Sequence, residues 1–329
     1  MKWWYVFGKI NELCAAYKCV IIISGHFWIW AAFCLACSVK IDANSINERN
    51  LFATELFQTI ATARQNENVI ISPVAIQTAL GLAYYGAQGK TATELQKGLH
   101  ESTKESKNSL AETYHHLLHS YVKSKTVLEI ANKIYTRQGL QIEPHFQEVA
   151  RKYFDSDVEQ LNFEKESEAV NSINKWLSEK TNGKIERVLD RIDADTNVAL
   201  VNAIFFKAKW ARPFMDSATT DKDFWLTEKE SVKVPTMYAD NWYYYADYPE
   251  LDAKAIELFF ENIDLTMWFI LPNQRNGLLQ LEQKLKGIDF AELEKHWEWN
   301  SVTVNLPKFK FEFDTDLKDS LKKVSLRVC

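Results

Sequence analysis

The run from Asn197 to Phe206, with the sequence NVALVNAIFF, constrains the fold more than any other segment of this chain. It is apolar at alternate and intervening positions alike, which predicts a central β-strand covered on both faces. Asn202 is the polar residue in its interior, between Val201 and Ala203. A buried amide without partners costs about 1–3 kcal/mol, so Asn202 is expected to have a specific hydrogen-bond partner. It is either an ordinary satisfied structural residue or part of a polar cluster that controls strand separation.

Helical signals dominate the chain up to about Thr181, and strand signals follow. Ser72 is expected to be the N-cap of a helix whose first residue is Pro73, because proline is favoured at the first helical position. This helix is expected to end at Gly86. A capping box at Thr91–Glu94 predicts the start of the next helix. Other helices are expected over 45–60, 109–120, 144–154 and 167–181, and near 277–297 and 314–316. Other strands are expected over 127–135, 255–260, 265–271, 301–306 and 309–313. This order predicts an α+β fold with mixed sheets.

One large domain accounts for most of the chain. No Pro/Gly/Ser-rich linker and no internal repeat divides residues 45–329, which are expected to form a single domain. The hydrophobic share of 47% supplies ample material for its core. The formal net charge of -5 favours neither nucleic acid nor an anionic membrane as a partner.

Residues 1–38 have the character of a targeting segment. The stretch from Phe27 to Ala36 is uninterruptedly apolar and has the length of a signal-peptide core, with lysines before it and small residues after it. The longer apolar run that begins at Val20 is near the minimum for a membrane span, so a retained signal anchor is the alternative. The expected localisation is secreted and extracellular, or retention in the secretory pathway by the anchor. Cysteines lie only near the two ends of the chain, so no disulfide framework is expected in the body.

Several segments, in order along the chain, resemble motifs of one known family. They are Asn68–Ile76, Gly86–Glu94, Ile130–Tyr135, Ile173–Trp176, Lys180–Ile185, Val201–Trp210 and Leu306–Phe309, followed by Asp316, Leu317 and Leu321. Together they resemble the serpins, the serine-protease-inhibitor superfamily, and the invertebrate-type secreted members in particular. The resemblance implies the serpin fold, with a helical N-terminal half, a large mixed sheet A, and sheets B and C.

The resemblance also implies roles for particular residues. Ser72 and Asn202 match the serpin shutter, the polar cluster beneath the large sheet that controls its conformation. Trp210 matches the breach, where the reactive loop begins to insert. Ala75 departs from the pattern, because the family usually has a second small polar residue there, and this thins the expected shutter network.

Serpins inhibit by conformational change. A protease cleaves an exposed loop, which inserts into the main sheet as an added strand and traps the acylated protease. The resemblance therefore implies an inhibitor of secreted serine proteases rather than an enzyme, with no cofactor. After Val324 the sequence leaves the family pattern, and it contains no small-residue hinge motif. We expect it to lack the reactive loop, its reactive-site bond and the C-terminal strands.

On this interpretation the chain does not inhibit by itself. The alternative is a non-inhibitory serpin-like binding protein, or a truncated isoform without protease-trapping activity. Sheets without their last strands would present apolar faces and unpaired edges, so self-association or aggregation is also expected. A membrane is expected as a partner only if the N-terminal segment is retained as an anchor.

Two other groups of residues carry weaker signals. His115 and His119 have the helical spacing of metal ligands, but a solvated helix face is the favoured interpretation, and no metal is expected. The run Trp242–Tyr245 is either a ligand platform or the surface of a strand, and the strand is favoured. No motif for a hydrolase nucleophile, a phosphate-binding loop or a zinc protease occurs in the sequence.

Overall fold

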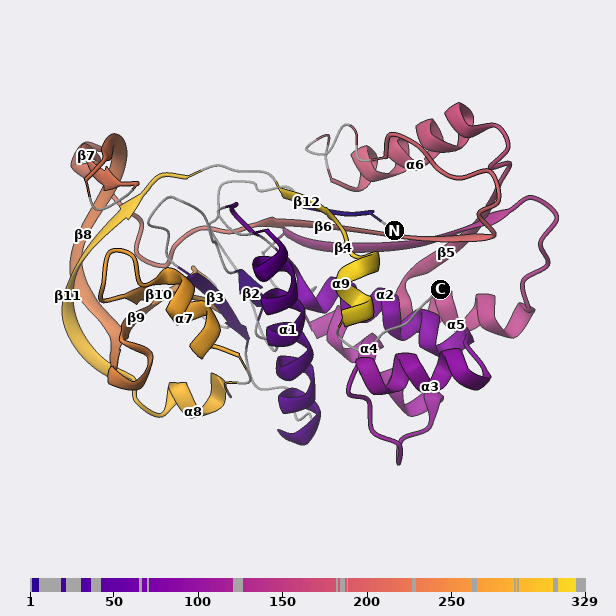
Figure 1. The fold of residues 1–329 in the computed structure, drawn as a ribbon, viewed down its shortest axis with the longest axis horizontal. Helices are drawn as coiled ribbons and strands as arrows, with labels where there is room; N and C mark the ends of the chain where they lie inside the picture. Colours follow the sequence, from indigo (N-terminus) through magenta and orange to yellow (C-terminus); the bar gives the residue numbers. More distant parts are fainter. Residues whose placement is uncertain are drawn as a thin grey trace.

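The structure of the chain is a computed structural model. It describes residues 2–5, 19–21, 31–36, 43–64, 67–69, 71–120, 127–181, 183, 187, 189–226, 229–261, 265–286, 288, 290–309 and 313–323. Figure 1 shows helices α2 to α5 gathered at one end, with a sheet lying over them, and strands β7 to β11 curving around the other end. The predicted α+β class is confirmed.

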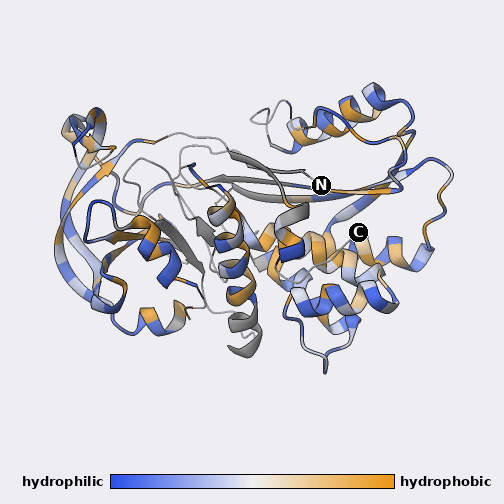
Figure 2. Ribbon diagram, in the orientation of Figure 1, coloured by the Kyte–Doolittle hydropathy of each residue, from blue (hydrophilic) through white to orange (hydrophobic). Residues whose placement is uncertain are grey.

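The N-terminal helices begin and end close to the predicted positions. They are α1 (Ala43–Ala63), α2 (Pro73–Gly86), α3 (Gly89–Gly98), α4 (Lys107–Ser120), α5 (Pro144–Phe154) and α6 (Glu166–Lys180). One apolar face of α1 is buried, with Phe52, Leu56, Phe57 and Ile60 at most 1% exposed. Figure 2 shows that α2 is mostly hydrophobic and α3 mostly hydrophilic, in keeping with a buried and an outer helix.

Helix α3 begins earlier than the sequence predicts. Its N-cap is Gln88, and Thr91 lies inside the helix, so the predicted capping box at Thr91–Glu94 is wrong. Gly89 has a φ of +55°, a conformation that glycine adopts without the steric cost of a side chain. This conformation at Gly89 allows α3 to begin only a few residues after the end of α2.

A three-stranded sheet lies between the helices. Its order is β5 (Ser156–Leu161), β4 (Val127–Arg137) and β6 (Val198–Lys207), with β4 parallel to β5 and antiparallel to β6. Helix α2 packs against one face of β6 and α6 against the other, so the predicted covering of both faces is confirmed (Figure 1). The predicted central position is wrong, because β6 is an end strand of this ladder among the described strands.

The second sheet is antiparallel and curved. It contains β7 (Thr220–Trp225), β8 (Ser231–Tyr248), β9 (Ala253–Phe259), β10 (Leu265–Pro272) and β11 (Glu298–Pro307). The predicted hairpin of β9 and β10 is confirmed by their antiparallel register, while its turn lies outside the described residues. Short helices α7 (Leu278–Lys284) and α8 (Phe290–Glu294) follow, with 3-10 turns at Asp216–Ala218 and Pro249–Leu251 earlier in the chain.

The N-terminal segment supplies strands to two different sheets. Strand β3 (Ala31–Ala36) pairs antiparallel with β10, and β2 (Cys19–Ile21) pairs with β3. Strand β1 (Lys2–Tyr5) pairs with β12 (Phe313–Asp316) and lies beside the open edge of β6. The last helix, α9 (Lys318–Lys323), begins after β12 and slightly later than predicted.

These strands do not decide whether residues 1–38 are processed, so the leader stays a prediction. None of the helices in the described ranges is long and apolar enough to cross a membrane.

Candidate functional site

Asn202 lies in the middle of β6 and has the partner that the sequence requires. Its Nδ2 donates to Oδ1 of Asn132 at 2.6 Å, and the two residues are directly opposite in the β4–β6 register. Asn132 in turn donates from its own Nδ2 to the carbonyl oxygen of Phe154 at 3.1 Å. Because Phe154 ends α5, this relay joins β6 through β4 to a helix terminus. Asn202 is 8% exposed and Asn132 is 5% exposed, so solvent competes little for these bonds.

Asn132 is the site residue that sequence reasoning missed. It lies within the strand motif Ile130–Tyr135, but nothing in that motif identifies its partner. The signal that finds it is the antiparallel alignment of the two predicted strands, which places the two amides opposite each other.

Ser72 is buried at the start of α2, as predicted. It is the N-cap residue, and its Oγ accepts from the backbone N–H of Ala75 at 3.4 Å. Since α2 packs against β6, Ser72 and Asn202 belong to neighbouring elements. Their described bonds run in different directions, one along α2 and the other across the sheet to Asn132. Position 75, where the family usually has a small polar residue, is a buried alanine here. Ala75 takes part through its backbone N–H, which donates to Ser72.

Trp210 follows the end of β6 and packs against the second sheet. It forms an isolated antiparallel bridge with Phe260, and the two rings stack with centroids 4.6 Å apart and planes at 9°. Phe214 contacts the same indole edge-on at 6.3 Å. Trp210 is 9% exposed, so its ring forms part of the core at the junction of the two sheets.

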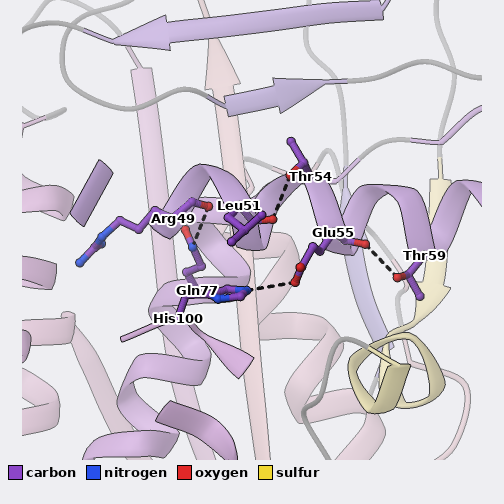
Figure 3. A network of polar contacts seen from close by, with 7 residues as sticks. All are labelled: Arg49, Leu51, Thr54, Glu55, Thr59, Gln77 and His100. Atoms are coloured by element: carbon purple, nitrogen blue, oxygen red, sulfur yellow. Dashed lines mark hydrogen bonds and ion pairs between the residues drawn. The ribbon is translucent and has the colours of Figure 1, made fainter. Parts of the chain in front are cut away.

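A polar network ties the first helices together beneath the sheets (Figure 3). Gln77 on α2 donates from Nε2 to the carbonyl oxygen of Arg49 on α1 at 3.2 Å. Glu55 on α1 pairs through Oε2 with Nε2 of His100, which follows α3, at 3.0 Å. These bonds fix α1 relative to α2 and α3, and no sequence motif indicates them.

The predicted histidine face is partly buried rather than fully solvated. The His115 and His119 rings lie 4.0 Å apart, and Nε2 of His119 is 3.7 Å from Oδ2 of Asp155. Burial, followed by repulsion from His119, lowers the pKa of His115 below its ordinary value. No cluster of three or more metal-ligating side chains is found in the parts of the chain that the structure describes.

Comparison of the sequence and fold with known proteins identifies the family of this chain. The family model described as "Serpin (serine protease inhibitor)" matches residues 47–328. The chain belongs to the serpin family. Alaserpin of Manduca sexta is 34% identical over 305 residues, a match that spans 91% of this chain and 77% of alaserpin. Serpin B4 of Homo sapiens is 32% identical, with 86% and 78% covered.

Solved serpin structures share the fold. Cleaved Serpin 42Da superposes with a TM-score of 0.80 at 32% identity, covering 85% of this chain and 76% of that one. Emu ovalbumin superposes with a TM-score of 0.78 at 26% identity, covering 85% and 77%. The serpin resemblance and fold inferred from the ordered motifs are therefore confirmed.

Proposed function

We propose that this serpin acts in protease inhibition through the insertion mechanism of its family. The supporting observation is the match over residues 47–328 to a family described as serine protease inhibitors. In this mechanism the protease serine attacks the scissile carbonyl, releasing the amine side as a new N-terminus and leaving an acyl ester. Insertion of the loop as a new strand then displaces the protease before water hydrolyses the ester.

Within that mechanism, Ser72 and Asn202 act as the shutter and Trp210 as the breach. The Asn202–Asn132–Phe154 relay supports the first assignment, because it is a buried polar cluster that joins β6 through β4 to the end of α5. The Trp210–Phe260 stack at the end of β6 supports the second, because it joins the two sheets there.

The 329-residue chain is proposed not to trap a protease alone. The basis is the sequence itself, in which no hinge motif of small residues occurs. The same observation favours a second candidate, a non-inhibitory serpin-like binding protein. Target proteases are expected to be secreted serine proteases, with the protein itself delivered to the extracellular space by residues 1–38.

The test is the formation of a covalent complex that survives SDS. The chain of residues 1–329, and a chimaera in which the segment after Val324 is replaced by the C-terminal segment of alaserpin, are each mixed with trypsin-like and chymotrypsin-like proteases. We expect an SDS-resistant adduct from the chimaera and none from the unaltered chain. A chimaera whose hinge residues are changed to proline is the matched control, because it is cleaved but cannot insert as a strand.

Each outcome bears on one part of the proposal. An adduct from the unaltered chain would refute the proposed inability to trap. Cleavage of the chimaera without any adduct would refute the inhibitory assignment for this body and favour the non-inhibitory candidate.

A further inference from the structure

An aromatic pocket opens where β8, β11 and the segment after β6 meet. Its volume is about 520 Å³, within the usual range for small-molecule sites. We define it by six of its lining residues: Trp210, Arg212, Phe214, Trp242, Tyr244 and Trp299. Trp210, the proposed breach residue, is one of the six, whereas the shutter residues Ser72 and Asn202 do not line the pocket.

The strand geometry explains why aromatic rings gather here. Trp242 and Tyr244 alternate along β8 and share a face, while the intervening Tyr243 is buried. Trp299 on β11 is directly opposite Tyr244 in the register, and their rings meet edge-on at 5.0 Å. Trp242, Tyr244 and Trp299 nevertheless remain 51%, 38% and 45% exposed. Three large aromatic side chains exposed side by side are typical of a binding surface.

Arg212 supplies the pocket's positive charge. Its Nη1 donates to Oδ1 of Asn241 and to the carbonyl oxygen of Trp242, the latter at 2.8 Å. Its guanidinium carbon lies 5.5 Å from the centre of the Trp299 ring, in cation–π contact. These contacts hold the guanidinium in place through one nitrogen. Among the described residues, Nε and Nη2 donate to no protein acceptor, and together they form the side-on fork that binds a carboxylate.

The surrounding charge favours an anion. No acidic residue lines the pocket, although the chain as a whole carries a formal charge of -5. Glu261, two residues after the lining residue Phe259, is paired with Lys209 at 3.8 Å. A local positive charge on aromatic walls therefore selects a ligand that is both planar and negatively charged.

We propose that the aromatic pocket binds a small aromatic carboxylate. The ligand ring stacks on the exposed indoles of Trp242 and Trp299, and its carboxylate accepts hydrogen bonds from Nε and Nη2 of Arg212. On this proposal Trp242 and Tyr244, which lie on strand β8 as expected, also serve as a ligand platform, and the cation comes from a separate segment.

Three probes that share an indole ring and differ in charge measure the contribution of the ligand's charge to binding. Indole-3-acetate, its neutral amide and cationic tryptamine are titrated into the full chain by calorimetry at neutral pH. We expect the acetate to bind roughly tenfold more tightly than the amide, because hydrogen bonds to charged groups are the stronger ones, and tryptamine to bind least. Equal affinity for acetate and amide, or no heat from the acetate at millimolar concentration, would overturn the proposal.

Variants then locate the site. Arg212→Gln is expected to reduce the acetate's affinity to that of the amide, and Trp299→Leu to weaken both. Arg275→Gln is the matched control, because Arg275 also lies over a tryptophan, Trp225 at 4.2 Å, outside this pocket. Near-UV circular dichroism checks that each variant is folded. Undiminished acetate binding by a folded Arg212→Gln variant, or an equal loss in Arg275→Gln, would show that the ligand binds elsewhere.

Discussion

Asn202 on β6 and Asn132 on β4 are joined side chain to side chain by a 2.6 Å hydrogen bond, although they lie 70 residues apart in the sequence. The bond crosses a strand pair whose backbone ladder already holds the two strands together. The amide pair therefore adds specificity for one register, because any slip would leave two buried amides without partners.

The first prediction concerns this pair. Asn202→Ala is expected to lower the free energy of unfolding by about 1–3 kcal/mol, because the Asn132 Oδ1 loses its donor in a buried site. Asn132→Ala should cost at least as much, since it also frees the Phe154 carbonyl. The double variant should cost less than the sum of the two. Urea denaturation of all four proteins measures the coupling, and strictly additive losses would contradict the bond's importance.

The second prediction concerns Gly81 in the buried helix α2. A Cβ at this position would lie 2.5 Å from Cε2 of Tyr114, whose hydroxyl is tethered to Glu101 at 2.9 Å. Alanine is the better helix former by about 1 kcal/mol, but overpacking a core costs about 1–3 kcal/mol. We therefore expect Gly81→Ala to lower the denaturation midpoint. Adding Tyr114→Leu should restore part of the loss, and a raised midpoint in the single variant would count against the clash.

The third prediction is a loss of stability in mild acid. The lowered pKa of His115 arises from burial and from its neighbours His119 and His116, and it is partly opposed by Asp155 and by a backbone contact with Lys152. The unfolded chain, with an ordinary histidine, binds this proton more readily. Stability should therefore fall as the pH falls through the ordinary histidine pKa, and it should be recovered above it.

Denaturant midpoints measured between about pH 7.5 and about pH 5.5 check this dependence. His115→Gln is expected to flatten the slope. His145→Gln serves as the control, because His145 lies on α5 and contacts Tyr85 at 3.2 Å instead. An unchanged slope in His115→Gln would place the acid sensitivity in other groups.

The fourth prediction concerns the N-terminal strands. Deleting residues 1–38 removes β3 and leaves β10 with an unpaired edge, which is a template for association. We expect this variant to form oligomers in light-scattering measurements made after size-exclusion chromatography. Deleting residues 1–6 is the matched control, because it removes β1 and keeps β2 and β3. A monomeric 39–329 chain with an unchanged melting temperature would contradict the structural role of β3.

Local sequence patterns were enough to predict the helices and strands. The partners of the site residues depend instead on pairing between distant segments. Ser72 before Pro73 marked the start of α2, and the apolar run around Asn202 marked β6, because both signals lie within a few residues. The partner of Asn202 depends on the register of two distant strands, so only the structure identified it. The same reason explains the misplacement of β6 within its sheet.

The site was predictable to a similar extent. The position of Trp210 followed from its motif, but its stack on Phe260 joins segments that no pattern connects. In the aromatic pocket, the run Trp242–Tyr245 was recognised from the sequence as the surface of a strand or a ligand platform. The arginine beside them comes from another segment, and its placement requires the folded chain.

The pairing of β1 with β12 also sets an order of events during synthesis. Lys2–Tyr5 leaves the ribosome long before Phe313–Asp316. At roughly 5–20 residues per second, the first strand waits on the order of tens of seconds for its partner. A peptidase that removes the N-terminal segment during translation would act before that partner exists. The β1–β12 pair therefore belongs only to molecules that complete translation with their first residues still attached.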